Sequence, residues 1–367
     1  MPSTRLLWTG DLHIGGLGSY FPNHKNPNSF IYKALEQACE HARNEGIKNV
    51  VLPGDVFDSP YPSQDEIIEL IRFTQEYSDL IFIVYFGNHD YESSGAISLQ
   101  MLHFISKLGA TKNIRLYMRP TAFKLDGVPV QIMPWPHHKR LDGPPALILA
   151  HVTVQGVKMN SGYKSRSNIT IEPRRDFWVI GDIHERHELH ERILYPGLMY
   201  QTNFGEKSGK GFTVIDASYS SEKGLRVKHK RHVIEPPFLL ENLVVHTADD
   251  LDKVQSDPTI RYKLFLKDDV QLPVDFLAKH PNIIWHTPFK NKNQLSMMQQ
   301  GAAFDEFLDK ADAVKDDQKI ITQGLRRFLE ARDWNDDKIK RAYGIVRQIV
   351  ADLSTSKKKA DSREHKS

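Results

Sequence analysis

Near-continuous apolar runs alternate with amphipathic stretches along the first part of the chain. The amphipathic stretches repeat their apolar positions at a helical period, at Ser29–Asn44, Gln64–Tyr77 and Ala96–Leu108. The apolar runs lie at Arg5–Thr9, Asn49–Leu52, Leu80–Phe86, Ala146–Ala150 and Phe177–Ile180. Strands that are apolar on both faces, alternating with helices, predict an α/β fold with a buried sheet. Hairpin-like strands are expected at Thr121–Leu125 and Val128–Met133.

The pattern changes after Gly205 and predicts further domains. Residues 1–204 form the first domain, and Phe204–Asp216 resembles a strand, a turn and a strand. A small α+β capping domain is expected over residues 205–290, with strands at Leu243–His246 and Tyr262–Leu266. Apolar residues at helical spacing predict a helical region over residues 300–353. The charged residues 354–367 are expected to be a disordered tail.

Composition narrows the class of protein. The single cysteine, Cys39, cannot form an intrachain disulfide or a thiolate metal cluster, so a reducing cytoplasmic setting is expected. No apolar run approaches the roughly 18 residues of a membrane span, and no secretory signal is visible, so no membrane association is expected. The net charge of +3 does not indicate a nucleic-acid binder, whereas 17 histidines allow a histidine-rich metal site.

Residues that ligate metals follow five of the apolar strands. They are Asp11 and His13, Asp55, Asn88, His151, and Asp182 with His184. Ligands of open α/β sheets bind at the carboxyl ends of the strands, so these side chains should meet at one place. One such residue is commonly a turn or capping residue, but the same coincidence at five strands favours a site. Asp58, in the loop after Asp55, is a further candidate catalytic residue, and a plain loop role explains it equally well.

The residue types indicate the chemistry of the site. Carboxylate, imidazole and amide ligands without sulfur suit Mn²⁺, Fe²⁺, Zn²⁺ or Mg²⁺. The seven residues are enough for two ions about 3.5–4 Å apart, which activate water and neutralise charge on a phosphoryl group. His89 and Asp90 are expected to be an acid–base pair beside the ions. The chain lacks a P-loop, a nucleophile elbow and a His-Glu-x-x-His motif.

Taken together, these motifs resemble the calcineurin-like metallophosphoesterase superfamily. Within it the chain is similar to the DNA double-strand-break repair nucleases, as an exonuclease subunit of the SbcD type, and especially to phage-encoded members. That closer resemblance depends on Gly54–Asp58, on the tract Tyr195–Glu206, and on the small domain and helical tail that follow. It implies a β-sandwich flanked by helices, with two metal ions, most commonly Mn²⁺.

The resemblance also implies a role for each site residue. The first ion would be held by Asp11, His13, Asp55 and His184, and the second by Asp55, Asn88, His151 and Asp182, with Asp55 bridging. His89 would protonate the leaving 3′ oxygen or support the transition state. Many relatives carry histidine in place of Asp182, and some carry a second catalytic histidine in place of Asp58.

Partners are implied in the same way. The resemblance implies DNA ends and single strands as substrates, a homodimer built on Gln64–Tyr77 and Ala96–Leu108, and an SMC-like ATPase of the SbcC type bound by the C-terminal helices. Contact with DNA is expected to be electrostatic and largely independent of sequence. The candidate contacts lie between two ligand strands, at Lys164, Arg166, Arg174 and Arg175, with Lys207 and Lys210 as further candidates.

Two other functions compete with a nuclease. A phosphodiesterase or phosphatase acting on a nucleotide or another small phosphoester would need a closed pocket and no long tail, and Gly205–Leu353 argues against it. A non-catalytic scaffold on the same fold would have lost ligands, whereas all seven positions keep ligating types and His89 is present.

Overall fold

The computed structural model describes residues 1–91, 98–99, 102, 112–158, 164–267, 270–273 and 275–289. The chain divides into a compact unit over Met1–Gly301 and a second over Ala302–Ser367. The expected helical region 300–353, the tail 354–367 and most of the expected helix Ala96–Leu108 lie outside the described residues.

Six strands form the first sheet, in the order β12-β11-β1-β2-β3-β4. In chain order they are β1 (Ser3–Trp8), β2 (Asn49–Leu52), β3 (Ile81–Tyr85), β4 (Ile114–Tyr117), β11 (Gly211–Ser220) and β12 (Gly224–Val233). The first four of these strands pair in parallel, and β11 joins β1 antiparallel. The parallel strands therefore all point their carboxyl ends at the same edge of the sheet.

The second sheet also has six strands, in the order β5-β6-β7-β8-β10-β9. They are β5 (Thr121–Leu125), β6 (Val128–Met133), β7 (Leu147–His151), β8 (Phe177–Gly181), β9 (His187–His190) and β10 (Ile193–Tyr195). Pairing is parallel from β6 to β7, β8 and β10 and antiparallel at both margins. Strands β7 and β8 thus also end side by side.

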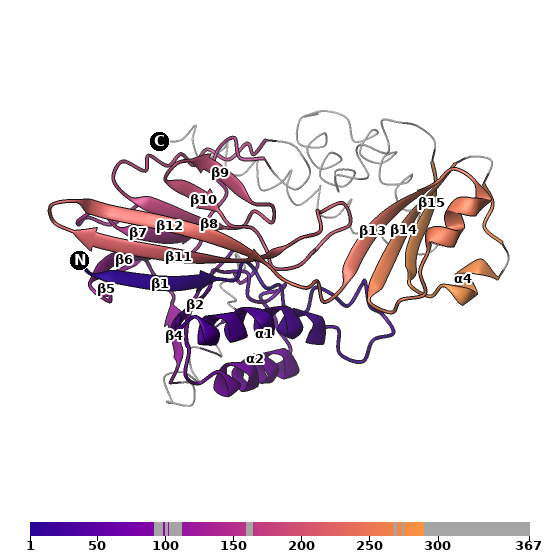
Figure 1. The fold of residues 1–367 in the computed structure, drawn as a ribbon, viewed down its shortest axis with the longest axis horizontal. Helices are drawn as coiled ribbons and strands as arrows, with labels where there is room; N and C mark the ends of the chain where they lie inside the picture. Colours follow the sequence, from indigo (N-terminus) through magenta and orange to yellow (C-terminus); the bar gives the residue numbers. More distant parts are fainter. Residues whose placement is uncertain are drawn as a thin grey trace, which may run out of the picture. The chain divides into compact units, whose positions relative to one another are not determined.

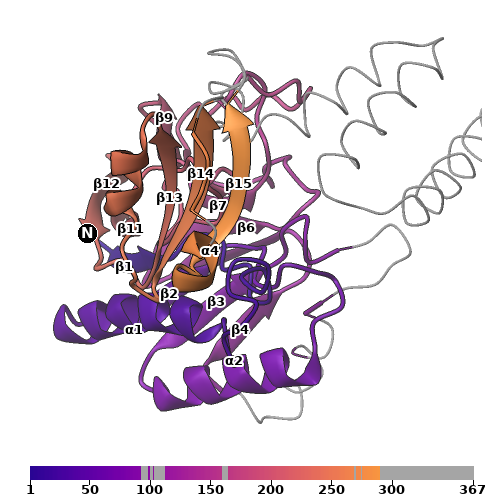
Figure 2. The same cartoon turned by 90° about the vertical axis from the view of Figure 1, so that its right-hand side faces the viewer.

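The two sheets pack face to face around a buried apolar layer. Trp8 and Tyr85 of the first sheet meet Val130 and Leu149 of the second in this layer. Helices α1 (Ser29–Asn44) and α2 (Gln64–Glu76) cover the other face of the first sheet, where α1 buries the Ala34 and Ala38 side of its surface (Figures 1 and 2). The central strands are buried on both faces, as their continuous apolar sequences predict. The expected α/β sandwich flanked by helices is confirmed.

The hairpin of β11 and β12 corrects one part of the sequence interpretation. A boundary at residue 204 assigns these strands to the capping domain, but β11 pairs with β1 along its length, from Trp8 and Thr213 to Ser3 and Ser218. Residues 211–220 also form one strand instead of a strand, a turn and a strand. The reason is long-range pairing, which joins residues about 200 positions apart in the chain and leaves no mark on the local pattern.

A third, all-parallel sheet follows, in the order β13-β14-β15. Its strands are β13 (Leu239–Val245), β14 (Ile260–Lys267) and β15 (Ile283–Phe289), with the short helices η1 (Ala248–Lys253) and α4 (Phe276–Lys279) between them (Figure 2). It has a small apolar core of its own around Leu264. In the part of the chain that the structure describes, no helix is long and apolar enough to cross a membrane.

Candidate metal centre

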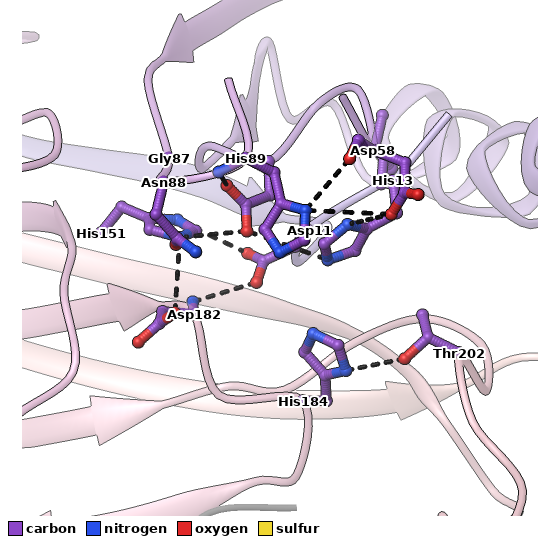
Figure 3. A network of polar contacts seen from close by, with 12 residues as sticks. Asp11, His13, Asp58, Gly87, Asn88, His89, His151, Asp182, His184 and Thr202 are labelled. Atoms are coloured by element: carbon purple, nitrogen blue, oxygen red, sulfur yellow. Dashed lines mark hydrogen bonds and ion pairs between the residues drawn. The ribbon is translucent and has the colours of Figure 1, made fainter. Parts of the chain in front are cut away.

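The loops after β1, β2, β3, β7 and β8 bring their polar side chains together (Figure 3). Three groups of side chains have ligand atoms within 4.8 Å of one another. These are Asp11 with His13 and His184, Asp11 with Asp55 and His151, and His13 with Asp58 and His89. Asn88 joins them through its amide oxygen, 3.0 Å from His151 Nε2, and Asp182 lies 3.9 Å from the same nitrogen. The structure thus brings all seven expected ligands to one place.

Buried polar atoms at the centre of this cluster lack partners. Asp11 and His13 are 1% and 6% exposed, yet Asp11 Oδ1 and His13 Nε2 have no hydrogen-bond partner among the described residues. A buried polar atom without a partner is costly, so such atoms call for a ligand. Oxygen and nitrogen donors that converge in this way fit divalent cations. The residues present therefore fit the metal pair that the sequence indicates.

Each of the three ligand histidines has its Nδ1 atom held by a group outside the seven expected ligands. Nδ1 of His151 donates to the Pro53 carbonyl oxygen at 2.8 Å, and Nδ1 of His13 lies 3.1 Å from Asp58 Oδ1. Nδ1 of His184 lies 3.1 Å from Glu206 Oε1. When the outer nitrogen donates in this way, the lone pair of a neutral imidazole is on Nε2, which is the tautomer that a metal ligand needs.

The charges at the centre favour an added cation. Burial raises the pKa of Asp11, an effect that the nearby His151 only partly opposes. Burial lowers the pKa of His151, but the carboxylates of Asp55 and Asp11 outweigh it and hold that pKa well above its ordinary value. The buried acidic centre thus stabilises positive charge placed within it. Divalent cations bound there would supply the same charge.

Unusual backbone conformations allow the ligand loops to approach closely. Three ligand residues, His13, Asp55 and Asp182, have left-handed φ angles of 45°, 45° and 88°. A Cβ atom on Gly54 would lie 2.5 Å from His151 Nδ1, and one on Gly87 would lie 2.0 Å from Asp55 Oδ1. Only glycine leaves room for these contacts, which explains why glycine precedes Asp55 and Asn88.

His89 lies at the border between the cluster and a cavity. Its backbone N–H donates to Asp55 Oδ1 at 2.8 Å, its Nδ1 lies 3.1 Å from the Asp58 carbonyl oxygen, and its side chain is 45% exposed. The cavity measures about 300 Å³ and is lined by His13, Gly16, Leu17, Ser19, Tyr20, Asp58, His89, His184, Tyr200, Thr202 and Asn203. His89 is therefore placed to exchange a proton with a molecule in that cavity.

Asp90 differs from the expected acid–base partner of His89. Its side chain is fully buried and accepts hydrogen bonds from the backbone of Val56, Phe57 and Gly87 and from Ser98 Oγ. Burial raises its pKa to about 6, with Asp55 adding to the effect. A carboxyl group enclosed by four donors has no access to a substrate. The expected acid–base role of Asp90 is therefore wrong: Asp90 holds the loops after β2 and β3 together instead of taking part in proton transfer.

The candidate DNA contacts differ in how exposed they are to solvent. Lys164, Arg166, Arg174 and Arg175 do not line the cavity, and all four are exposed. Lys207 is also exposed. The expectation that Lys210 contacts DNA is wrong. Its side chain is only 5% exposed, and its ammonium group lies 3.0 Å from both Glu185 and Glu206. A buried lysine that is paired twice cannot serve as a surface contact for phosphate.

Sequence reasoning missed Glu206 and Thr202. Glu206 is 9% exposed, and its carboxylate accepts from Thr202 Oγ1 at 2.8 Å as well as facing His184. Burial raises the pKa of Glu206, but His184 and Lys210 outweigh it and lower that pKa to about 2. Both residues lie in the tract Tyr195–Glu206, on which the closer family resemblance depends. The resemblance of this tract to the nuclease family was therefore the sequence signal that could have identified Glu206 and Thr202.

Asp182 provides a direct test of this geometry. Its Oδ1 faces His151 Nε2, Thr153 donates to its Oδ2, and its own N–H donates to Asp11 at 3.0 Å. We expect Asp182→Ala to lose one of two bound metals, and Asp182→His to stay active with a shifted metal preference, because nitrogen is softer than carboxylate oxygen. Elemental analysis and activity with Mn²⁺, Mg²⁺ and Zn²⁺ measure both. Wild-type metal content in Asp182→Ala would make Asp182 a turn residue only.

Comparison with known proteins decides the family. Residues 4–186 match the family model described as calcineurin-like phosphoesterase. This chain carries a calcineurin-like phosphoesterase domain. The matched region runs from β1 to the loop after β8 and includes all seven candidate ligands. The expected superfamily is therefore confirmed.

Curated relatives of this phosphoesterase are DNA repair proteins. Two are named DNA double-strand break repair protein Mre11, from Methanosarcina acetivorans and Methanosarcina mazei. They are 25% and 21% identical over 233 and 231 residues, which is 58% of this chain in both cases. The alignments span 37% and 36% of those proteins, so the chain matches little more than a third of their length.

A solved structure of a Pseudomonas putida nuclease is also similar. The likeness covers 43% of this chain and 66% of that one, at 15% identity and a TM-score of 0.27. At this score it adds nothing to the fold described above.

Proposed function

We propose that this phosphoesterase is a metal-dependent DNA nuclease. It acts as a double-strand exonuclease and a single-strand endonuclease, as the nuclease subunit of an SbcC–SbcD-type complex in DNA repair, recombination and replication. The observation that carries the proposal is a pair of buried atoms, Asp11 Oδ1 and His13 Nε2, which have no hydrogen-bond partner among the described residues. They lie inside a cluster of seven ligand-type side chains. The names of the two DNA repair relatives favour DNA as the substrate.

Two divalent ions, which we propose to be Mn²⁺, would share Asp55. Asp11, His13 and His184 would complete the first site, and Asn88, His151 and Asp182 the second. When bound, such ions activate water and neutralise charge on the phosphoryl group. Asp55 suits the shared position because its Oδ2 lies 3.4 Å from His151 Nε2 and 3.9 Å from His13 Nε2, which belong to the two different sites.

His89 would supply the proton of the leaving oxygen. The Asp58 carbonyl oxygen accepts from Nδ1, which leaves Nε2 as the ring nitrogen that exchanges a proton with the substrate. The Asp58 carboxylate lies 4.0 Å from His89 Nδ1 and 3.1 Å from His13 Nδ1. Asp58 thus contacts a ligand and the proton donor, and we propose that it orients both instead of reacting itself.

A direct assay tests the proposed function. Linear double-stranded DNA should be degraded in the presence of Mn²⁺ and remain intact with EDTA. Bis-p-nitrophenyl phosphate and free nucleotides serve as control substrates. Hydrolysis of the small phosphoesters without any cleavage of DNA would favour the alternative phosphodiesterase or phosphatase, and inactivity toward all of them would favour a scaffold.

We also propose an SMC-like ATPase partner and a homodimer. The dimer would use α2, where Ile68 is 44% exposed and Tyr61, just before the helix, is 64% exposed. The ATPase would bind beyond residue 301. Co-purification of the ATPase with the full chain, but not with a chain that ends at Gly301, is the expected result. An ATPase that still binds the shortened chain would place its site elsewhere.

A further inference from the structure

A carboxylate outside the ligand set faces one of the ligand histidines. Glu206 Oε1 lies 3.1 Å from His184 Nδ1, and Thr202 Oγ1 lies 2.7 Å from the same nitrogen. The hydroxyl of Thr202 donates its one proton to Glu206 Oε1 at 2.8 Å, so toward the histidine its oxygen can only accept. Both acceptors therefore require a proton on Nδ1, which leaves the lone pair of His184 on Nε2.

Glu206 is itself held firmly in place. Its second oxygen, Oε2, accepts from the backbone N–H of Thr202 at 3.2 Å and lies 3.0 Å from Lys210 Nζ. The side chains of Glu206 and Lys210 are 3% and 5% exposed. A buried pair whose hydrogen bonds are all made fixes its own geometry, and therefore the plane of the His184 ring.

The same lysine offers a built-in comparison. Lys210 Nζ lies 3.0 Å from Glu185 Oε1 as well, and it donates to the His184 carbonyl oxygen at 3.0 Å. Glu185 is thus a second carboxylate on the same ammonium group, but the structure records no contact between it and the His184 ring. The two glutamates therefore share Lys210, but only Glu206 contacts the His184 ring.

We propose that Glu206 is a positioning residue of the metal centre, which fixes the tautomer and orientation of His184 for one of the two metal sites. The proposal rests on the proposed two-metal function. A carboxylate that accepts from the outer nitrogen of a ligand histidine also increases the basicity of that ligand. Loss of such a partner usually weakens metal affinity by about 10- to 100-fold.

Metal titration of the intact protein provides the test. Calorimetric titration with Mn²⁺ compares wild type, Glu206→Gln and Glu185→Gln. The expected result is a roughly 10- to 100-fold weaker binding at one site in Glu206→Gln, with the other site nearly unchanged. Glu185→Gln removes a carboxylate from the same lysine and should keep both affinities. Equal weakening in the two variants, or wild-type binding in Glu206→Gln, overturns the proposal.

A second measurement needs no variant. In metal-free wild-type protein, ¹⁵N chemical shifts of His184 should show the proton on Nδ1. A neutral ring that carries its proton on Nε2 instead of Nδ1 would contradict the proposal even if Glu206→Gln failed to fold. Failure of the proposed function has a different signature, because then wild type itself would not bind two metal ions.

Discussion

Replacing Asp55 by asparagine is expected to abolish the proposed nuclease activity almost completely and to leave fewer than two bound metals. Asp55 is 2% exposed, and its carboxylate faces His13, His151 and the backbone N–H of His89. Asparagine tolerates the left-handed backbone at this position, so the change removes the charge and little else. Loss of a shared ligand should exceed the roughly 10- to 100-fold effect of losing an outer partner.

Elemental analysis and DNA digestion measure this effect together. Asp216→Asn is a matched control, because Asp216 is an exposed aspartate of β11 whose ion pair with Arg5 at 2.8 Å lies on the surface. Such pairs contribute roughly 0–1 kcal/mol, so the control should keep its stability, metal content and activity. Two tightly bound metals in Asp55→Asn would show that the bridging ligand is another residue.

Replacing His89 by alanine should separate metal binding from catalysis. His89 lines the cavity and has its Nδ1 on the Asp58 carbonyl oxygen, but it is not one of the seven proposed ligands. His89→Ala should therefore keep two metals and lose activity by on the order of 10²-fold or more, as expected for a lost acid–base group. Single-turnover cleavage of DNA and elemental analysis give the two quantities.

His246→Ala is the corresponding control, since His246 is exposed and follows β13 outside the cluster. It should match wild type in both measurements. A His89→Ala protein with normal cleavage would remove His89 from the mechanism, and one that lost a metal would make it a ligand.

The strands, the helices and the polar residues at the strand ends can be predicted from short stretches of sequence. Continuous apolar strands alternating with helices predict the α/β fold with buried strands, whereas the sandwich of two sheets is implied only by the family resemblance. The residues that follow these strands indicate that Asp11, Asp55 and His151 meet at one place, where the structure has them. Asp11 and Asp55 meet because β1 and β2 are parallel and end at a common edge of the first sheet. His151 joins them from the end of β7, which belongs to the second sheet. That these side chains bind metals stays a prediction.

The parts that the sequence does not predict depend on contacts between distant segments. The pairing of β11 with β1 and the contact between Glu206 and His184 both form only after the chain folds back on itself. Asp90 is misassigned from sequence because a buried aspartate that holds loops and a catalytic one look the same beside His89. Lys210 is misassigned because residue type alone does not reveal burial.

The left-handed backbone at His13, Asp55 and Asp182 sets a limit on engineering this protein for heat resistance. Each such residue costs on the order of 1 kcal/mol relative to glycine, in a fold whose whole stability is about 5–15 kcal/mol. Selection of variants for stability alone would therefore favour glycine at these three positions. It would yield more stable proteins that lack three of the proposed metal ligands, so these positions need to be held fixed while the rest of the chain is varied.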